Sequence, residues 1–363
     1  MRYLTEESID KIAVGAAVLG TGGGGDPYIG KLVAKQAIKK YGPVKLISVD
    51  ELKEDDLVVP VSGMGAPTIT IEKLLSEIEL TAPLEKMEEL VGKKVDVIIP
   101  IEIGGINSLM PIAVAAKKGL PIVDADSMGR AFPEAQMVTF YLAGYESSPV
   151  TMADEKGNTA VLYPKDGIWA ERMARCLTIE MGGSSSVTDY HLTGEQVRKA
   201  CVKDTLTIAE KIGEILMENK SNAKFGIDKM LKELKGYRLF EGKIVDIKRG
   251  LSGGFTRGHA FFKGINDYEG DYSILFQNEH LIAKKVDEPL CITPDLIAVL
   301  DLETGLPITT ERMKYGSRVV VVAFPCNEQW RTEKGIETVG PRYFGYDVDY
   351  IPVEEIQEKL GGK

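Results

Sequence analysis

The sequence predicts an α/β N-terminal domain with a largely parallel or mixed sheet, followed by a C-terminal domain built around a β-barrel with added helices. The chain has 363 residues, 44% of them hydrophobic, and single cores stop growing at about 250–300 residues, so two domains are expected. In the first half, short β-rich apolar runs alternate with glycine-containing loops and helical stretches, the order typical of a parallel sheet. The predicted domains are 1–166 and 167–363, the second divided into helices (about 167–235) and a β-barrel-like part (about 237–350).

Composition excludes several classes of partner. The formal net charge of −10 comes from 54 acidic and 44 basic residues, and no run of Lys or Arg is long enough to neutralise a nucleic-acid backbone. The N-terminus lacks the apolar core of a signal peptide, and no apolar stretch reaches the ~20 residues of a membrane span. We therefore expect a cytoplasmic protein that binds neither nucleic acid nor membranes. The four cysteines lie far apart in the sequence, which predicts reduced, buried thiols.

The first elements are expected to be two helices joined by glycines. Thr5 can cap a helix that ends at Gly20, and a second helical pattern covers residues 28–40. Consecutive glycines let backbone N–H groups approach an anion, and the N-terminus of the next helix adds the positive end of its dipole. The alternative is a tight turn between helices. The candidate substrate-binding residues of this segment are Gly22, Gly23, Gly24, Gly25 and Asp26.

The surroundings of these glycines exclude two common nucleotide sites. The dinucleotide (NAD) fingerprint needs a strand before the glycines, whereas the sequence predicts a helix there. The Walker loop of ATP-binding proteins needs Gly-Lys-Ser or Gly-Lys-Thr, and neither follows. The histidines, His191, His259 and His280, form no HxH or HExxH pattern. The cofactor is therefore unknown from the sequence, with a divalent metal as one candidate.

Strand-loop-helix units are expected next. Ligands of open parallel sheets bind beyond the carboxyl ends of the strands, so the loops after these strands and the glycine turn are expected to line one cleft. The predicted strands are 57–61, 95–101 and 122–123, and the predicted helices lie near 70–91, 107–118 and 134–144.

These loops carry acidic side chains and hydrogen-bond donors. Asp124 and Asp126 follow one predicted strand, and Glu102 ends its neighbour. Carboxylates this close need a proton, a cation or a substrate N–H between them, so general base, metal ligand and solvated loop acid all stay open for each.

The donors in the same loops are further candidates for substrate binding. Gly104 and Gly105 offer backbone N–H groups, and Asn107 and Arg130 can donate to a substrate carbonyl or carboxylate. Pairing of Arg130 with the nearby acids is the alternative.

The pattern changes beyond residue 165. A helix is expected near 167–175, residues 182–186 are expected to form a flexible link, and Thr193 with Gln196 resembles a capping box that opens a long helix. His259 follows a glycine-rich loop that can carry it toward the first domain as a catalytic candidate, with an ordinary surface histidine as the alternative. The β-like runs of this part are 243–248, 259–262, 273–276, 296–300 and 318–324.

Four strings together resemble one family: LGTGGGGDPY (19–28), EIGGINS (102–108), VDADSMGRAFPE (123–134) and GGFTRG (253–258). It is the S-methyl-thiohydantoin desulfurase-like family, formerly an uncharacterised hydantoinase/oxoprolinase-associated family. The resemblance runs nearly end to end, and four long motifs in one order are more specific than any single glycine loop. It implies an N-terminal α/β domain, a C-terminal β-barrel, and hydrolytic removal of a methylthio group from a thiohydantoin-type ring.

Two functional hypotheses follow. In the first, the protein is a hydrolase in which Asp124 or Asp126 acts as general base toward water, while glycine-loop N–H groups and Asn107 hold the ring. In the second, it is a non-catalytic subunit that binds a nucleotide or cyclic amide for a hydantoinase/oxoprolinase partner, with Asp126 as a hydrogen-bond acceptor. Both hypotheses include a small-molecule ligand, and we expect a homo-oligomer.

Overall fold

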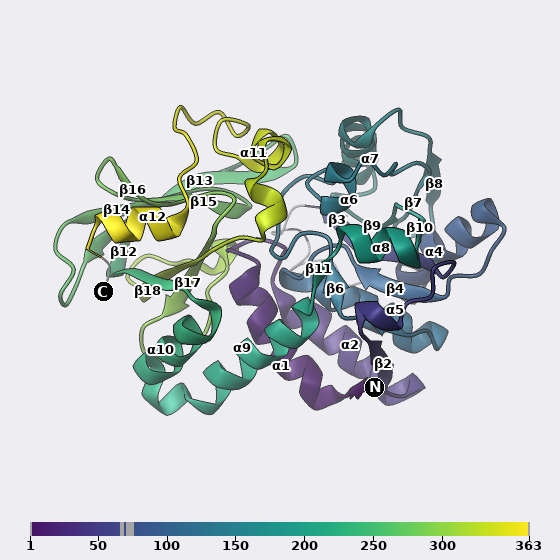
Figure 1. Ribbon diagram of the computed structural model, residues 1–363, viewed down its shortest axis with the longest axis horizontal. Coiled ribbons are helices and arrows are strands. Elements are labelled where there is room, and N and C mark those ends of the chain that lie inside the picture. The colour runs from purple at the N-terminus through teal and green to yellow at the C-terminus, as the bar shows by residue number, and fades with distance from the viewer. Residues whose placement is uncertain (1, 66–68, 70–75, 362–363) are drawn as a thin grey trace.

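Two halves lie side by side in the computed structural model, which describes residues 2–65, 69 and 76–361 (Figure 1). The N-terminal half is a mixed β-sheet with helices, and the C-terminal half is built on a curled antiparallel sheet. Within the described residues, no helix is long and apolar enough to cross a membrane.

The N-terminal helices confirm the prediction. Thr5 caps α1 (Glu6–Leu19) by accepting a hydrogen bond from the Ser8 N–H, and the helix ends at Gly20. Helix α2 (Pro27–Tyr41) follows Asp26, whose side chain accepts from the Tyr28 N–H. A helix therefore precedes the glycines, as expected from the sequence, and not the strand of a dinucleotide-binding fold.

The N-terminal sheet is mixed, as expected. Its hydrogen-bonded order is β1-β2-β5-β4-β3-β9-β7-β8, with β10 paired to β3. Neighbours β2, β5, β4 and β3 are parallel, so the carboxyl ends of the three predicted strands meet at one edge. The bounds are β1 (Arg2–Leu4), β2 (Val44–Ile47), β3 (Leu57–Gly65), β4 (Val97–Pro100), β5 (Ile122–Val123), β7 (Val150–Ala153), β8 (Thr159–Leu162), β9 (Ser184–Thr188) and β10 (Leu192–Thr193).

The flexible link expected at 182–186 is wrong. Ser184 to Thr188 form β9, a fully buried strand that pairs with both β3 and β7. Helix α7 (Gly167–Glu180) packs its buried alanines, Ala170 and Ala174, against this part of the sheet. The sequence did not predict this strand because runs of serine are typical of loops. Here the small side chains are buried in a strand between β3 and β7. The N-terminal sheet thus continues past residue 166, and the domain boundary there stays a prediction.

The helices beside the sheet differ in detail from the predicted ones. Helix α5 (Met110–Lys118) packs on β2, β3 and β4 after a 3-10 turn, η2 (Gly105–Ser108). Helix α4 (Glu77–Val91) packs on β7 and β9, and residues 70–75 of the predicted helix 70–91 lie outside the described residues. The helix expected at 134–144 is limited to α6 (Thr139–Leu142), because the segment before it is irregular.

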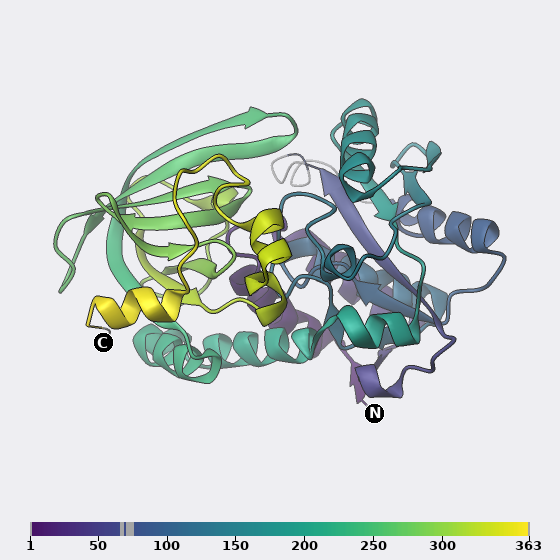
Figure 2. The same ribbon diagram turned by 45° about the horizontal axis from the view of Figure 1, so that its top comes forward.

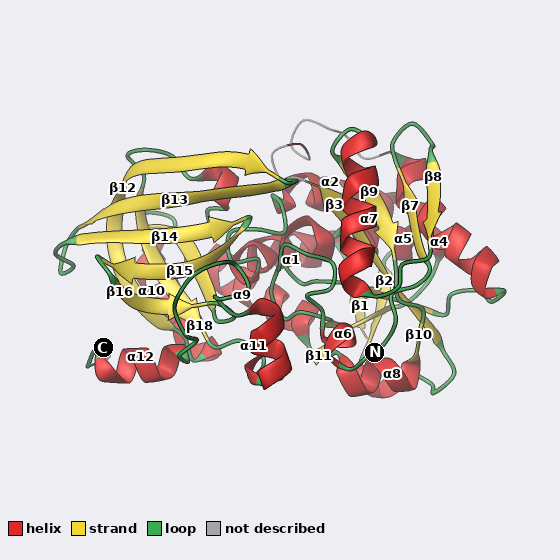
Figure 3. Cartoon of the chain, turned by 90° about the horizontal axis from the view of Figure 1, so that it is seen from above, coloured by secondary structure: helices red, strands yellow, loops and turns green. Residues whose placement is uncertain are grey.

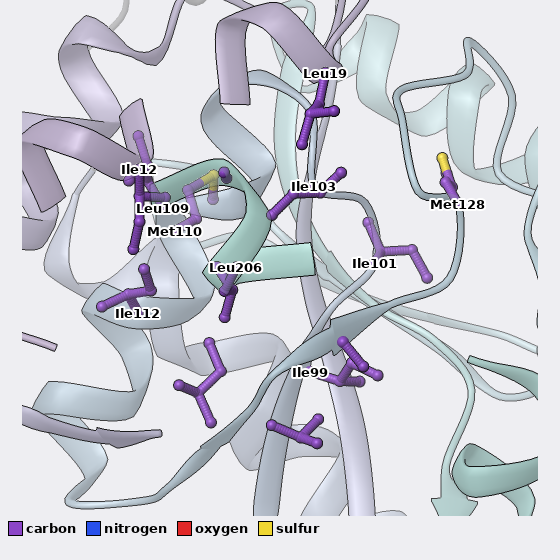
Figure 4. Packing of buried hydrophobic residues seen from close by; sticks show 14 of the residues in the cluster. Ile12, Leu19, Ile99, Ile101, Ile103, Leu109, Met110, Ile112, Met128 and Leu206 are labelled. Atoms are coloured by element: carbon purple, nitrogen blue, oxygen red, sulfur yellow. The ribbon is translucent and has the colours of Figure 1, made fainter. Parts of the chain in front are cut away.

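Aliphatic side chains fill the core between the helices and the sheet (Figure 4). This core reaches the loop after β4, where Ile101 and Ile103 are buried on either side of Glu102. The packing therefore fixes the position of a candidate site residue. The labelled members of the cluster are Ile12, Leu19, Ile99, Ile101, Ile103, Leu109, Met110, Ile112, Met128 and Leu206.

Helices run along both halves of the molecule (Figure 2). The capping box of Thr193 and Gln196 is confirmed at α8 (Gly194–Ala200), but the expected single helix is broken. After Ala200 the chain forms β11 (Val202–Lys203), which pairs with β6 (Ala125–Asp126), before α9 (Thr205–Glu218) and α10 (Ala223–Leu234).

Glycines let α1 and α9 pack closely. A Cβ atom on Gly15 would lie 1.9 Å from the Ala209 carbonyl oxygen, and one on Gly213 would lie 1.9 Å from that of Lys11. Helix α9 is thereby packed directly against α1, the first helix of the chain.

The C-terminal sheet is antiparallel and curls into a half-barrel (Figure 3). Its order is β16-β15-β14-β13-β12-β18-β17, and its inner face holds a separate hydrophobic core. The sheet is consistent with the β-barrel predicted from the sequence, but it is a half-barrel and a closed barrel is not confirmed. Strands β15 and β16 were not among the predicted β-like runs. The bounds are β12 (Tyr237–Ser252), β13 (Phe255–Gly264), β14 (Asp271–Gln277), β15 (Glu279–Lys285), β16 (Glu288–Ile292), β17 (Leu296–Asp301) and β18 (Arg318–Phe324), and helices α11 (Glu333–Val339) and α12 (Val353–Lys359) follow.

Candidate functional site

A cavity of about 110 Å³ lies where the two halves meet. Its walls come from the end of β3, the loop after β4, the glycine turn, the segment before α6, helix α7, strand β9 and the β14–β15 turn. Each of the loops expected to converge contributes to this one cavity. Their lining residues are Gly24, Gly25, Gly63, Met64, Gly65, Glu102, Asn107 and Met128.

The predicted site residues divide into two groups. Gly24, Gly25, Glu102 and Asn107 line the cavity. The others lie outside its lining: Gly22, Gly23, Asp26, Gly104, Gly105, Asp124, Asp126, Arg130 and His259.

Glu102 is a buried acid at the cavity wall. Its side chain is only 4% exposed, and Oε1 accepts a 2.6 Å hydrogen bond from Nδ2 of Asn107. Asn107 also accepts from the Gly63 N–H at 2.7 Å, so the amide fixes Glu102 against the end of β3. No described residue donates a hydrogen bond to Oε2 of Glu102. This oxygen is therefore available to a ligand or a water molecule.

Glu279 is a second buried acid at this cavity, and sequence reasoning missed it. It lies at the turn between β14 and β15, in the C-terminal half. Its Oε1 accepts a 3.0 Å hydrogen bond from the Gly24 N–H, and its Oε2 has no hydrogen-bond partner among the described residues. Only the left-handed backbone of the preceding Asn278 marks this turn as unusual (φ +55°), and a sequence does not display it.

The two acids influence each other electrostatically. Burial, the charge of Glu279 and that of Asp126 raise the pKa of Glu102 well above its usual range, against the Asn107 hydrogen bond. Burial raises the pKa of Glu279 to about 7, although the nearby Arg130 and the Gly24 N–H oppose the rise. Like charges in a low-dielectric site disfavour ionisation of both groups at once, so each acid favours the protonated form of the other.

The glycine turn binds a carboxylate of the protein itself. Gly22, Gly24 and Gly25 have positive φ, and a Cβ atom on Gly23 would lie 2.0 Å from Oε1 of Glu279. A Cβ atom on Gly105 would lie 2.2 Å from the Gly24 carbonyl oxygen, so Gly104 and Gly105 serve to pack against this turn. The anion that the glycines were expected to attract is thus the carboxylate of Glu279.

Asp126 and Asp124 are bound to backbone and to neighbouring helices. Oδ2 of Asp126 accepts from the N–H groups of Ile103, Met128 and Gly129, and burial raises its pKa to about 7 against these bonds. Asp124 accepts hydrogen bonds from both the N–H and the hydroxyl of Thr207 in α9. These carboxylates therefore hold loops and helices in place.

Arg130 and Asp26 connect the two halves. The buried guanidinium of Arg130 donates to Oγ1 of Thr21 at 2.9 Å and to the carbonyl oxygen of Asp295 at 3.0 Å. Asp26 forms an ion pair with Arg312. The alternative role for Arg130 was a direct pair with the carboxylates after β5. Its guanidinium instead donates to neutral oxygens, those of Ala131, Pro294, Asp295 and Thr21.

His259 lies in the middle of β13, paired with Lys248 and Leu275, and not in a loop. Burial and the charges of Lys284 and Lys248 lower its pKa. The expectation that a loop carries it toward the first domain was wrong because the β12–β13 hairpin extends farther than its glycines suggested.

Cysteines and metal ligands are dispersed. All four cysteines are free, and Cys201, Cys291 and Cys326 are buried as expected, whereas Cys176 is exposed. Within the described part of the chain, no group of three or more His, Cys, Asp or Glu side chains could hold a metal ion.

The fold and the cavity define a mixed α/β protein whose cavity is lined in part by an acid from a curled antiparallel sheet. The chain belongs to the S-Me-THD-like family: the model of the family's N-terminal domain matches residues 7–164, and that of its C-terminal domain matches residues 165–353. This confirms the family resemblance of the sequence motifs. A crystal structure of a protein from Chromobacterium violaceum is similar over 97% of this chain and 100% of that chain, with 25% sequence identity and a TM-score of 0.78. A comparison with curated proteins found no match.

Proposed function

We propose that this protein is a hydrolase of cyclic-amide metabolism that removes the methylthio group from an S-methyl-thiohydantoin-type ring bound in the cavity. Membership of the S-Me-THD-like family supports the substrate class. The observation that carries the proposal is the pair of buried acids, Glu102 and Glu279, each with one oxygen that no described residue binds. Paired carboxyl groups with raised pKa values suit acid–base catalysis near neutral pH.

The reaction needs one base and one acid. A water molecule loses a proton to a carboxylate as its oxygen bonds to the ring carbon that carries sulfur. The carbon–sulfur bond then breaks, the leaving sulfur receives a proton from a carboxylic acid, and methanethiol departs. The remaining proton of the water moves to the adjacent ring nitrogen, which leaves a carbonyl group and an N–H in the ring, so the products are a hydantoin and methanethiol.

The surroundings of each acid assign its role. Glu279 accepts from the Gly24 N–H, and the charge of Arg130 lowers its pKa, so both favour its ionised form as the base. Glu102 faces the charges of Glu279 and Asp126, which favour its protonated form as the acid. This assignment replaces Asp124 and Asp126 as the proposed base, because the oxygens of both accept hydrogen bonds from elsewhere in the protein.

A turnover assay tests the proposal. Purified wild-type protein and the variants Glu102→Gln and Glu279→Gln would be incubated with an S-methyl-thiohydantoin, and released methanethiol would be measured with a thiol reagent. Loss of a general acid or base lowers rates by about 10²–10⁴-fold, so each variant is expected to lose at least ~100-fold. Tight binding without turnover by the wild type would instead support the non-catalytic subunit.

A further inference from the structure

The cavity has a third buried carboxylate, on the other side of β3. Strands β4 and β9 flank β3, so Glu102 follows one neighbour of β3 and Asp189 follows the other. Asp189 lines the same cavity and is 6% exposed. Its Oδ1 has no hydrogen-bond partner among the described residues.

Within the part of the chain that the structure describes, no other residue compensates for the burial of Asp189. Burial raises its pKa to about 7, opposed only by its own backbone N–H, with no charged neighbour contributing. The cation nearest in the cavity lining, Arg175, is engaged elsewhere: it donates to Oε1 of Glu171 at 2.7 Å and to the Pro133 carbonyl oxygen at 3.1 Å. A buried carboxylate with an unpartnered oxygen costs stability, so such a group persists where it has another use.

The backbone next to Asp189 is also unusual. Tyr190 has a φ of +41°, which non-glycine residues rarely adopt, although its ring is buried against Phe140 at 5.7 Å between centroids. Strained residues held by their packing are concentrated at ligand-binding sites. The strain and the unpartnered oxygen are separate observations: Asp189 lines the cavity, and the strained residue directly follows it in the chain.

We propose that Asp189 is a specificity-determining residue that accepts a hydrogen bond from a ring N–H of the ligand. The ligand class is accordingly a five-membered cyclic amide with at least one nitrogen that carries no alkyl group. This inference rests on the proposed function only for the identity of the ring. Both S-methyl-thiohydantoin and hydantoin retain a ring N–H, so the contact serves substrate and product alike.

The test measures binding separately from turnover. Hydantoin, 1-methylhydantoin and 3-methylhydantoin would be titrated calorimetrically into the wild type, Asp189→Ala and Asp189→Asn. Glu311→Ala is the matched control, because Glu311 also has buried carboxylate oxygens without a partner but does not line the cavity. A hydrogen bond to a charged group contributes about 1.5–3 kcal/mol, which corresponds to about 10-fold to 150-fold in affinity.

The expected results concern a ratio of affinities. The wild type and Glu311→Ala should bind hydantoin at least ~10-fold more tightly than one of the two methylated rings. Asp189→Ala should bind both rings alike, whereas Asp189→Asn, which keeps an acceptor oxygen, should retain part of the preference. Melting temperatures would verify that each variant is folded, and a merely structural role for Asp189 would leave the ratio unchanged.

The outcomes separate the two proposals. Equal affinity of the wild type for all three rings, or an unchanged ratio in Asp189→Ala, overturns the role of Asp189 even if the enzyme turns over. A preference that depends on Asp189 without any turnover supports the contact and overturns the hydrolase. Failure of every ring to bind the folded wild type overturns the role of Asp189, and the hydrolase is overturned with it if the S-methyl-thiohydantoin is not turned over either.

Discussion

The Gly24 N–H donates a 3.0 Å hydrogen bond to Oε1 of Glu279, and 255 positions of sequence separate the two residues. This contact joins the glycine turn of the first half to the β14–β15 turn of the second. The cavity wall therefore includes Glu279 only when the two halves are packed together. Changes on either side of the contact should therefore affect stability and activity together.

Gly24→Ala is expected to destabilise the protein as well as weaken ligand binding. Gly24 has a φ of +71°, and its Cβ atom would lie 2.7 Å from the Gly104 carbonyl oxygen. Backbone strain contributes about 1–3 kcal/mol, to which the overlap adds. Gly92→Ala is the matched control, because Gly92 has a φ of +72° and nothing within 4 Å of its Cβ position. Chemical denaturation would measure the free energy of unfolding of both variants. An equal decrease in the two would contradict a role for close packing at Gly24.

Glu279→Gln is expected to make stability less dependent on pH. Burial raises the pKa of Glu279 in the folded protein to about 7, compared with about 4.3 in an unfolded chain. The folded state therefore binds the proton more strongly, and the stability that this group contributes is present below pH ~4 and lost as the pH rises to ~7. The melting temperature of the variant relative to wild type should rise between pH 5 and pH 8, as thermal melts in a series of buffers would measure. A constant difference would contradict the raised pKa.

Asp126→Asn is expected to lower stability more than it lowers the rate of the folded enzyme. The carboxylate accepts hydrogen bonds from the N–H groups of Ile103, Met128 and Gly129, and an amide would set an NH₂ group against one of these donors. An unsatisfied buried group costs about 1–3 kcal/mol. Rates per folded molecule, measured well below the melting temperature, should fall less than those of Glu279→Gln. If the rate per folded molecule fell more in Asp126→Asn than in Glu279→Gln, Asp126 would be the better candidate for the general base.

The sequence predicts well what depends on neighbouring residues. The cap at Thr5, the capping box at Thr193 and the parallel strands that place Glu102 at a sheet edge all follow from local patterns. Asn107 was assigned to the right loop because that loop directly follows a predicted strand.

What the sequence could not predict depends on contacts between distant segments. Glu279 and Asp189 reach the cavity only through the packing of the halves and through the pairing of β9 with β3. Asp126 was predicted as a general base from its position after a strand. That position does not reveal whether the carboxylate binds a ligand or, as in the structure, the backbone N–H groups of Ile103 and Gly129. Burial and hydrogen-bond partners, which distinguish these cases, are properties of the folded chain.

Asn107→Ala is expected to lower turnover by misplacing Glu102 and not by removing a contact to the substrate. The amide joins Oε1 of Glu102 to the backbone of Gly63, so its loss removes the side-chain donor that holds this acid in place. Because the Asn107 hydrogen bond lowers the pKa of Glu102, its removal should raise that pKa further. The acid would then stay protonated to higher pH, and the alkaline limb of the pH–rate profile should move to higher pH.

Steady-state kinetics from pH 6 to 10 would measure this shift together with a fall in kcat, while KM for the ring stays within about threefold. Asn107→Asp places a further carboxyl group beside Glu102 and should also move the limb upward. A large rise in KM with an unmoved limb would mean that Asn107 binds the substrate directly.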